Sequence, residues 1–440
     1  MALGGLGERI RATVRPGDAL LLGLLVLPLA LAWPEARRLV GASAWLYEAG
    51  RLAGVLGLAM MVLAALLSAR VPMIERWFGG LPRLWLLHRG MGYGAFILIM
   101  LHVLLLAFAR LEASLDAAIA TLFPPLAAVA IWLGWAAWLL LLISIWPTFG
   151  TSRRMDYQRW KGLHLLAAGA LVLALAHGLW LAPQGLLWWM LGGLGIAAIG
   201  WRKLLSPWVA RRLYEVAAVT PLAPDVVEIS LQPLHGRLHH RAGQFVYLAP
   251  LDPDIEAGYG EEHPYTVASD PNNEILRIGI KNLGDASQAL QTVAVGSRAW
   301  IEGPYGDLLQ PLDPTRRQLW IGGGIGITPF VSGARARAGQ CAAAETHAHL
   351  VYLADRPERA YYLDMLMQIA ATTGTFDATV HYFRDRGPVT MEFLQAHCPD
   401  LADREVFVCG PPPMIAHVRT ILMVAGIPRH RIHTEVFDFL

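Results

Sequence analysis

Six apolar runs divide the first half of the chain. They cover residues 17–33, 44–69, 84–109, 121–146, 158–181 and 185–205. A hydrocarbon core about 30 Å thick needs about 20 consecutive apolar residues in a helix, so we predict six transmembrane helices. The first run is short, contains Pro28 and follows three arginines, and a cleaved signal peptide is the alternative for it. The topology of the other five runs is the same in both cases.

The pattern changes after about Arg212. Short β-branched and aromatic runs then alternate with Pro, Gly and Asp turns as far as about Leu312, which predicts a small antiparallel barrel. From about Arg316, buried strands alternate with helices, as in an α/β domain with a parallel sheet. The clearest strands are 226–231, 244–248, 275–281, 299–302, 318–321, 350–353 and 405–408. We therefore expect three domains, at 1–210, 211–314 and 315–440.

Basic residues are distributed unevenly between the predicted loops. Segments 1–16, 70–83, 150–161 and 202–212 carry 14 Lys and Arg, whereas the opposite loops carry three. The positive-inside rule therefore places both termini and the second half of the chain in the cytoplasm. We expect a multi-pass protein of a bacterial-type inner (plasma) membrane.

Composition narrows the chemistry. Hydrophobic residues make up 55% of the 440 residues, and the net charge of +2 favours no nucleic-acid partner. Only three cysteines occur, namely Cys341, Cys398 and Cys409. That number excludes a four-cysteine iron–sulfur cluster and a CxxCH haem attachment site. It also indicates a reducing compartment without a disulfide framework.

Four histidines, and no others, occur in the first 212 residues: His88, His102, His164 and His177. They form two pairs, spaced 14 and 13 residues apart, in the third and fifth apolar runs. An ionisable residue inside a membrane helix is costly and by default marks a functional site. Each pair spans about 20 Å of helix, so two such helices would hold two metal centres, one above the other. Bis-histidine haem is the natural centre because imidazole is a good axial ligand.

Both runs travel outward, so we predict an inner centre on His88 and His164 and an outer one on His102 and His177. The alternative is four packing histidines bonded to neighbouring side chains. Fourteen residues return within about 40° of one helix face, whereas thirteen fall about 140° short. We therefore expect the fifth helix to be kinked or overwound, or the haems to be laterally offset, with Gly169 as the weak point.

Other membrane residues have two interpretations each. Arg89 and Lys161 would neutralise haem propionates or act only as anchors at the inner surface. Arg51 would serve the outer haem or the acceptor, or would pair with Glu48 at i, i+3. The stripe at Trp132, Trp135 and Trp138 has helical spacing, and we interpret it as packing rather than as an electron relay.

Motifs in the second half suit nucleotide cofactors. Residues 263–266 (His-Pro-Tyr-Thr) set a ring beside a hydroxyl, and residues 280–287 place a lysine before a Gly-Asp-Ala-Ser turn whose N–H groups suit a pyrophosphate. Residues 322–329 form a glycine turn in which Thr328 fits an N-cap and Pro329 a first helical position. An acid at Asp355 suits NAD and a base at Arg356 suits NADP, and we favour NADPH.

Together the motifs resemble two known families. Residues 88–92 (His-Arg-Gly-Met-Gly) and 160–164 (Trp-Lys-Gly-Leu-His) are similar to the transmembrane domain of ferric reductases and NADPH oxidases. That domain has six helices and two b-type haems, with ligands spaced by the same 14 and 13 residues. The later motifs, through residues 409–414 and the final 433–440, resemble the ferredoxin–NADP reductase superfamily. Its Arg-x-Tyr-Ser appears here as His-Pro-Tyr-Thr, typical of the oxidase and ferric reductase branch.

The resemblance implies a fold and a set of site residues. The fold is an all-α six-helix haem bundle, an antiparallel β-barrel that binds FAD, and an α/β domain that binds NAD(P). The four histidines would ligate the two haems b. Cys409 would lie at the nicotinamide and Phe437 on the flavin ring. The residues that contact FAD and NADPH (or NADH) would be His263, Pro264, Tyr265, Thr266, Ile280, Lys281, Gly284, Ala286, Ser287, Gly323, Gly324, Gly326, Thr328, Pro329, Arg356, Gly410 and Pro411.

The expected function is transmembrane electron transfer from cytoplasmic NAD(P)H through FAD and two haems to an acceptor outside. We favour O₂, which would give superoxide; a ferric or cupric chelate is the alternative acceptor. Two other classes are a membrane redox sensor or haem-binding assembly subunit, and a flavoreductase for which the helices are only an anchor. No obligatory protein partner is evident, so constitutive activity is the simplest expectation.

Overall fold

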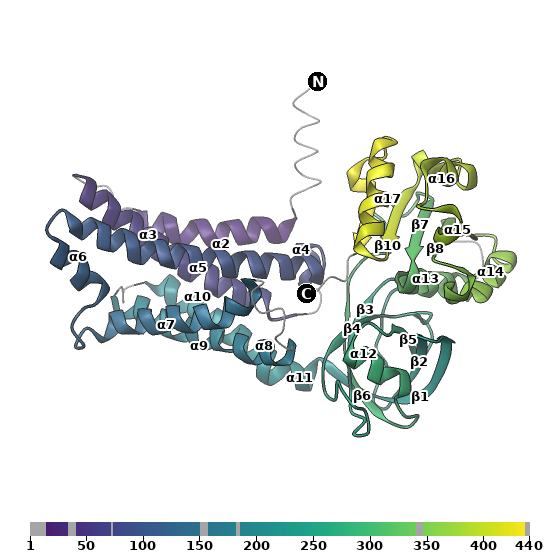
Figure 1. The fold of residues 1–440 in the computed structure, drawn as a ribbon, viewed down its shortest axis with the longest axis horizontal. Helices are drawn as coiled ribbons and strands as arrows, with labels where there is room; N and C mark the ends of the chain where they lie inside the picture. Colours follow the sequence, from purple (N-terminus) through teal and green to yellow (C-terminus); the bar gives the residue numbers. More distant parts are fainter. Residues whose placement is uncertain are drawn as a thin grey trace. The chain divides into compact units, whose positions relative to one another are not determined.

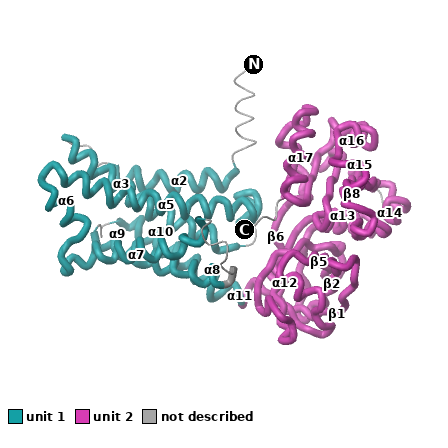
Figure 2. The backbone as a smooth tube through the Cα atoms, viewed as in Figure 1, with its two compact units in different colours: residues 1–207 teal, residues 208–440 magenta. Residues whose placement is uncertain are grey.

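The computed structural model describes residues 15–33, 41–71, 74–149, 157–181, 185–339 and 346–435. The chain divides into two compact units, residues 1–207 and 208–440 (Figure 2). The first unit is built from helices, and the strands belong to the second (Figure 1).

The apolar runs of the first unit are helical, although two of them are divided between two helices. The principal helices are α2 (Pro16–Ala32), α3 (Ala42–Leu67), α5 (Leu81–Leu111), α7 (Val129–Ile145), α9 (Leu166–Leu181) and α10 (Leu186–Gly200), with short helices α4 (Glu75–Phe78), α6 (Leu115–Leu122), α8 (Tyr157–His164) and α11 (Ser206–Val209) between or after them. Among the described residues, four helices are long and apolar enough to cross a membrane: Ala42–Leu67, Leu81–Leu111, Val129–Phe149 and Arg159–Leu181. The unit is therefore a membrane-type helical domain, and six crossings stay a prediction.

The fourth apolar run does not form one helix. The sequence predicted 121–146, but α6 ends at Leu122 and α7 begins only at Val129. Pro124 and Pro125 lie between them, and proline has no N–H to continue a helix. Two indoles close this gap, because Trp135 donates to the Leu122 carbonyl (2.8 Å) and Trp132 to that of Pro125 (3.4 Å). These contacts support the packing role expected for the two tryptophans.

The long helices associate in two pairs. Helix α3 packs along α5, and α7 packs along α9. A buried cluster that includes Val62, Leu141, Leu171 and Leu191 joins residues of both pairs and of α10. The fifth apolar run is interrupted, as its histidine spacing required: α8 ends at His164 and α9 begins at Leu166.

The interruption is a short, tight turn. Leu165 N–H bonds to the Gly162 carbonyl (3.2 Å) and Ala168 N–H to the Leu165 carbonyl (3.0 Å). Such i to i−3 bonds wind the chain by about 120° per residue, against about 100° in an α-helix. The overwinding reduces the 140° shortfall between His164 and His177. The prediction of an irregular helix is confirmed, but Gly169 as the weak point is wrong, since it lies within α9.

The second unit begins with an antiparallel half-barrel. Its strands are β1 (Arg211–Ala223), β2 (Val226–Pro233), β3 (Phe245–Pro250), β4 (His263–Thr266), β5 (Leu276–Lys281) and β6 (Arg298–Tyr305), in the order β4-β3-β6-β1-β2-β5. An antiparallel bridge from Val267, just after β4, to Ile278 in β5 brings the two edge strands together. Buried side chains such as Ile229, Leu248 and Ile301 fill the interior.

A parallel α/β layer follows. Strands β7 (Gln318–Gly323), β8 (Ala348–Ala354), β9 (Phe376–Tyr382), β10 (Glu405–Cys409) and β11 (Ile432–Glu435) pair in the order β11-β10-β7-β8-β9. Helices α13 (Thr328–Ala338) and α14 (Leu363–Thr372) pack on one face, and α16 (Met391–His397) and α17 (Pro412–Val424) on the other. Alternate residues of β7 reach opposite faces: Trp320 joins the first cluster, and Leu319 and Ile321 the second.

Ion pairs fasten the half-barrel to the parallel layer. Glu228 of β2 is only 5% exposed and accepts from Arg335 of α13 (2.9 Å) and from Arg277 (3.2 Å). Asp225, in the turn between β1 and β2, pairs with Arg359 (2.8 Å). A buried carboxylate needs its cations, because an uncompensated charge in the interior is strongly destabilising.

We predict that Arg335→Leu lowers the free energy of unfolding of the second unit by about 2–4 kcal/mol, because it removes one cation from the buried Glu228. Scanning calorimetry of the full chain in detergent measures the change. The matched control is Arg316→Leu, which breaks an exposed pair with Asp313 (3.7 Å) and should cost at most about 0.5 kcal/mol. Equal effects of the two substitutions would contradict the interpretation.

Candidate functional site

The structure brings the four membrane histidines together as two pairs. The ring centroids of His88 and His164 lie 5.9 Å apart, and those of His102 and His177 lie 6.3 Å apart. The ring planes are close to perpendicular in both pairs, at 74° and 77°. Helix α5 supplies one member of each pair, and the α8–α9 segment supplies the other.

Three of the four rings are fixed by backbone carbonyls of a neighbouring helix. Nδ1 of His88 lies 2.8 Å from the Ala64 carbonyl, and Nδ1 of His102 lies 2.8 Å from the Gly50 carbonyl, both on α3. Nδ1 of His177 lies 2.7 Å from the Ala130 carbonyl on α7. A neutral imidazole that donates through Nδ1 carries its lone pair on Nε2, which is the arrangement of an oriented metal ligand.

Glycines make room for the pair formed by His102 and His177. A Cβ on Gly54 would lie 2.7 Å from Nδ1 of His102, and one on Gly134 would lie 3.0 Å from Nδ1 of His177. Both contacts are closer than side-chain carbons normally approach. These two glycines were not predicted from the sequence, in which nothing distinguishes them from other helix glycines. Gly90 and Gly92, by contrast, have no atom within 4 Å of an added Cβ.

The residues present fit a bis-histidine haem. An imidazole nitrogen binds a metal at about 2 Å and lies about 1.1 Å from the ring centre, so two rings on one ion have centroids about 6 Å apart. The observed 5.9 and 6.3 Å match this value. Within the described ranges, no group of three or more His, Cys, Asp or Glu side chains gathers as metal ligands. Pairwise ligation is therefore what these residues offer.

The Arg51 guanidinium is engaged by neighbouring acceptors. Its Nε donates to Glu48 (2.7 Å) and its NH2 to the Ala32 carbonyl at the end of α2 (2.9 Å). The pairing alternative is therefore confirmed for this residue. In the segments that carry His88 and His164, Arg89 is exposed and Lys161 half-buried.

The two predicted FAD segments meet at the seam of the half-barrel. Tyr265 of β4 is in register with Val246 of β3 and packs against the barrel core. Burial raises the pKa of its phenol. The Val267–Ile278 bridge aligns this strand with β5, which ends at Lys281. Ile280 is fully buried, so only its backbone can face a ligand.

The turn after β5 is more compact than the motif suggested. Helix α12 (Asp285–Ala289) has five residues, and the Ser287 hydroxyl is engaged locally. It accepts from Leu283 N–H (2.8 Å) and donates to the Gly284 carbonyl (2.9 Å). Ala286 packs against Gly258, whose added Cβ would lie 2.9 Å from it. Ser287 therefore shapes the turn that presents the backbone N–H groups.

The two predicted nicotinamide turns lie side by side. The 322–326 turn follows β7, the 409–411 turn follows β10, and Gly322 is in register with Cys409. The strand order reverses between these strands, at the switch point where open α/β sheets bind ligands. An added Cβ on Gly326 would lie 2.6 Å from the Gly410 backbone. Gly323 packs as tightly against Met414, whereas Gly324, at φ +55°, has open space around it.

The seam and the glycine turns adjoin. An added Cβ on Gly279 of β5 would lie 2.8 Å from the Tyr362 hydroxyl and 2.9 Å from Thr328 Cγ2. Gly279 and Tyr362 were missed from the sequence, since their contact joins segments far apart along the chain. The contact places β5 against the start of α13, and so places the predicted flavin and nicotinamide segments next to each other.

The prediction of Thr328 as an N-cap is wrong. The N-cap of α13 is Ile327, and Thr328 already has helical backbone angles. The 3₁₀ turn Gly324–Ile327 starts the helical path earlier, so the Thr328 hydroxyl donates back to the Ile325 carbonyl (3.0 Å). Pro329 lies in the first turn, as its missing N–H favours.

The environment of Cys409 disfavours the thiolate form that a nucleophile requires. The residue is fully buried, and burial raises the pKa of its thiol, with a further contribution from the Glu435 carboxylate in register beside it. The thiol is therefore neutral at physiological pH. Gly410 and Pro411 continue the turn into α17. Phe437 and Cys341 lie outside the described residues.

Arg356 follows β8 and lies close to both acidic and basic side chains. Its Nε lies 3.8 Å from Asp355 and 3.9 Å from Glu358, and Arg384 adds a second cation 3.9 Å from Asp355. Both signals read from the sequence are thus present at the end of this strand, and the preference for NADPH stays a prediction.

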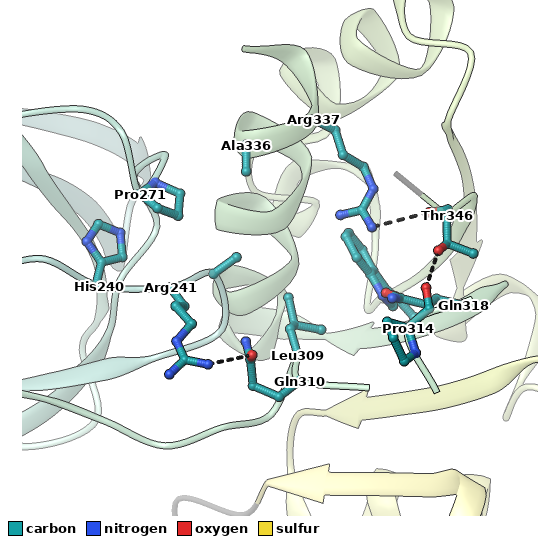
Figure 3. A pocket seen from close by; sticks show the side chains of 12 residues that line it. His240, Arg241, Pro271, Leu309, Gln310, Pro314, Gln318, Ala336, Arg337 and Thr346 are labelled. Carbon is teal, nitrogen blue, oxygen red and sulfur yellow. Dashed lines mark hydrogen bonds between the residues drawn. The ribbon is translucent and has the colours of Figure 1, made fainter. Parts of the chain in front are cut away.

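A cleft of about 380 Å³ lies away from these turns (Figure 3). It is lined by the start of β7, the end of α13 and the half-barrel, where Arg241 donates to Gln310 (2.9 Å) and Arg337 stacks over Trp320 (4.5 Å). The glycine turn is at the opposite end of β7. This cleft is therefore separate from the nucleotide segments.

Comparison with known proteins gives three family matches along the chain. Residues 53–175 match a "ferric reductase like transmembrane component", residues 211–309 an "FAD-binding domain", and residues 320–420 an "oxidoreductase NAD-binding domain".

Curated relatives are similar to part of the chain. The reductase subunit of stachydrine N-demethylase from Rhizobium meliloti is 30% identical over 53% of this chain and 69% of that protein. The reductase component of propane 2-monooxygenase from Rhodococcus jostii is 26% identical over 50% of this chain and 62% of that protein. A flavohemoprotein of Xylella fastidiosa is 25% identical over 52% of this chain and 59% of that protein. The chain thus spans about three fifths of the latter two relatives.

Among solved structures, the flavohem-like FAD/NAD binding domain of nitric oxide dioxygenase from Vibrio cholerae aligns with a TM-score of 0.45 and 23% identity. The alignment covers 51% of this chain and 98% of that domain.

We predict that Gly326→Ala slows flavin reduction by NADPH about a hundredfold, because its methyl group would push the Gly410 turn aside and misplace the dinucleotide. Anaerobic stopped-flow absorbance measures the rate. Gly374→Ala, at a position with open space, is the control. An unchanged rate in Gly326→Ala would remove this turn from the site.

We predict that Gly54→Val removes one haem and leaves the other, because its side chain would displace the His102 imidazole. The haem-to-protein ratio from pyridine haemochrome spectra should fall to about half of the wild-type value. Gly23→Val, on α2 with open space around it, should keep the full ratio. Full haem content in Gly54→Val would show that haem binding does not require the space that Gly54 leaves for the His102 imidazole.

Proposed function

Because the chain belongs to the oxidoreductases that join a ferric reductase-like transmembrane component to FAD-binding and NAD-binding domains, we propose that it moves electrons across a membrane. The donor is NAD(P)H, the path runs through FAD and two b-type haems, and the acceptor lies on the opposite side. The observation that carries this proposal is the pairing of four membrane histidines at ligand separation in the chain that also holds the dinucleotide turns.

The residues of the second unit have a positioning task. Hydride transfer requires the two rings of donor and flavin to be held in near-attack contact. The turns at 322–326 and 409–411 would hold the dinucleotide, and the seam at Tyr265 and Lys281 would hold the flavin. The contact between Gly279 and the start of α13 supports this, since it brings the two segments together. Flavin accepts an electron pair and releases single electrons.

The residues of the first unit would hold each haem iron without leaving an open coordination position. His88 with His164 would ligate the inner iron and His102 with His177 the outer iron. An iron held by two histidines would have no open position, so the acceptor would be reduced without binding iron. The predicted outer loops contain no cysteine, methionine or histidine to bind a metal ion.

Oxygen is the acceptor we propose, with each NAD(P)H supplying two electrons to two O₂ molecules and yielding two superoxide anions. The second candidate is a ferric chelate, which the match to a ferric reductase-like component favours. In this account residues 1–210 form the six-helix haem domain, residues 211–314 bind FAD, and residues 315–440 bind NAD(P)H. Both termini are cytoplasmic at a bacterial-type inner membrane.

We predict that His177→Ala keeps the rate of flavin reduction by NADPH within about twofold of wild type and abolishes reduction of the outer acceptor. The substitution removes a ligand of the last haem and so interrupts electron transfer after the flavin. Superoxide dismutase-sensitive cytochrome c reduction reports the oxygen product, and a ferric chelate assay reports the second candidate. The exposed His235→Ala is the control and should leave both activities intact. Survival of acceptor reduction in His177→Ala would refute the path.

A further inference from the structure

Two tryptophans accompany the inner histidine pair. Trp85 precedes His88 by three residues and Trp160 precedes His164 by four, so each indole lies one turn from the imidazole on the same side of its helix. The Trp85 and His88 rings meet edge to face at 5.6 Å, whereas the Trp160 and His164 rings stack at 5.3 Å with 24° between planes.

No aromatic residue stands three or four positions before either histidine of the outer pair. The residues three and four positions before His102 are Ile99 and Leu98, and those before His177 are Ala174 and Leu173. The outer imidazoles instead rest on glycines and bond to carbonyls. The two pairs are therefore oriented by different means.

His164 differs from the other three histidines in a second way. Its Nδ1 is buried and makes no hydrogen bond of normal geometry, although the ring is directed to the Ser144 backbone. The other three rings each have a carbonyl at 2.7 or 2.8 Å. A ligating histidine normally donates its second nitrogen to an acceptor that fixes the ring's orientation. At His164 that restraint is reduced to a contact with the Ser144 backbone that falls outside hydrogen-bond geometry.

The backbone at His164 gives it little support. His164 is the last residue of α8, and the tight turn at Leu165 follows directly. A side chain at a helix end with no orienting hydrogen bond can rotate about its own bonds unless another group packs on it. The stacked Trp160 is that group.

We propose that Trp160 is the positioning residue for His164, and that its stacked indole replaces the carbonyl that orients the other three imidazoles. The proposal rests on the proposed function, because it places an iron between His88 and His164. Trp85 has no equivalent role, since the Ala64 carbonyl already fixes His88. The two tryptophans therefore form a matched pair for a test within one site.

The test is carbon monoxide binding to the dithionite-reduced full chain, with haem content measured on the same samples. A six-coordinate bis-histidine haem excludes CO, and a loosened ligand admits it. We expect no CO difference spectrum from wild type or from Trp85→Leu. We expect Trp160→Leu to bind CO at one haem of two, or to lose that haem, and Trp160→Phe, which keeps a stacking ring, to behave as wild type.

Low-temperature electron paramagnetic resonance gives a second readout. The near-perpendicular imidazole planes should produce a strongly anisotropic low-spin signal, and Trp160→Leu should change one of two such signals. Trp189→Leu, which removes an exposed indole on α10, should change neither.

Three results would overturn the inference: a Trp160→Leu protein with two CO-silent haems and unaltered signals, equal effects of Trp85→Leu and Trp160→Leu, or loss of haem from Trp160→Phe as well. A wild-type protein that carries no haem would instead overturn the proposed function, so the two failures are distinguishable.

Discussion

The hydrogen bond between an imidazole N–H and a backbone carbonyl of the next helix organises the first unit. In an apolar environment a polar group without a partner is costly, so an acceptor inside the protein stabilises a histidine in a membrane helix, and three of the four histidines have one. His88 and His102 find theirs on α3, and His177 finds its acceptor on α7. These bonds require close helix approach, which explains why α3 packs along α5 and α7 along α9. They also leave Nε2 as the nitrogen available for a metal.

Close backbone approach governs the second unit in a comparable way. The turns after β7 and β10 touch through Gly326 and Gly410, and β5 meets the start of α13 through Gly279. A side chain at any of these positions would separate segments that must cooperate on one dinucleotide and one flavin. The buried Glu228, held by Arg335, fixes the half-barrel against the parallel layer. Each unit thus uses local contacts to position groups that come from distant parts of the sequence.

Patterns that repeat along the chain could be predicted, and contacts between distant segments could not. Apolar runs marked the principal helices, and short β-branched and aromatic runs between turn residues marked strands such as β2, β5 and β7, because composition and length are properties of the sequence. The histidine spacing even required an irregular fifth helix. Its location at Leu165 was missed, because nothing in the sequence distinguishes Gly162, whose carbonyl accepts from Leu165 N–H, from Gly169. The carbonyls of Ala64, Gly50 and Ala130 were equally invisible, because every residue has one. Pro124 and Pro125 are a sequence signal for the gap before α7. The gap was still missed, because the apolar residues on both sides were interpreted as one continuous helix.

The most direct test of the central claim is an anaerobic titration of the purified full chain with NADPH, followed by optical spectra, with haem and FAD quantified beforehand. We expect two haems per FAD, reduction of both haem Soret and α bands by NADPH alone, and reoxidation when air is admitted. A flavin that bleaches with NADPH in a protein whose haem is absent or stays oxidised would contradict it, and would leave the histidine pairs without a role in electron transfer.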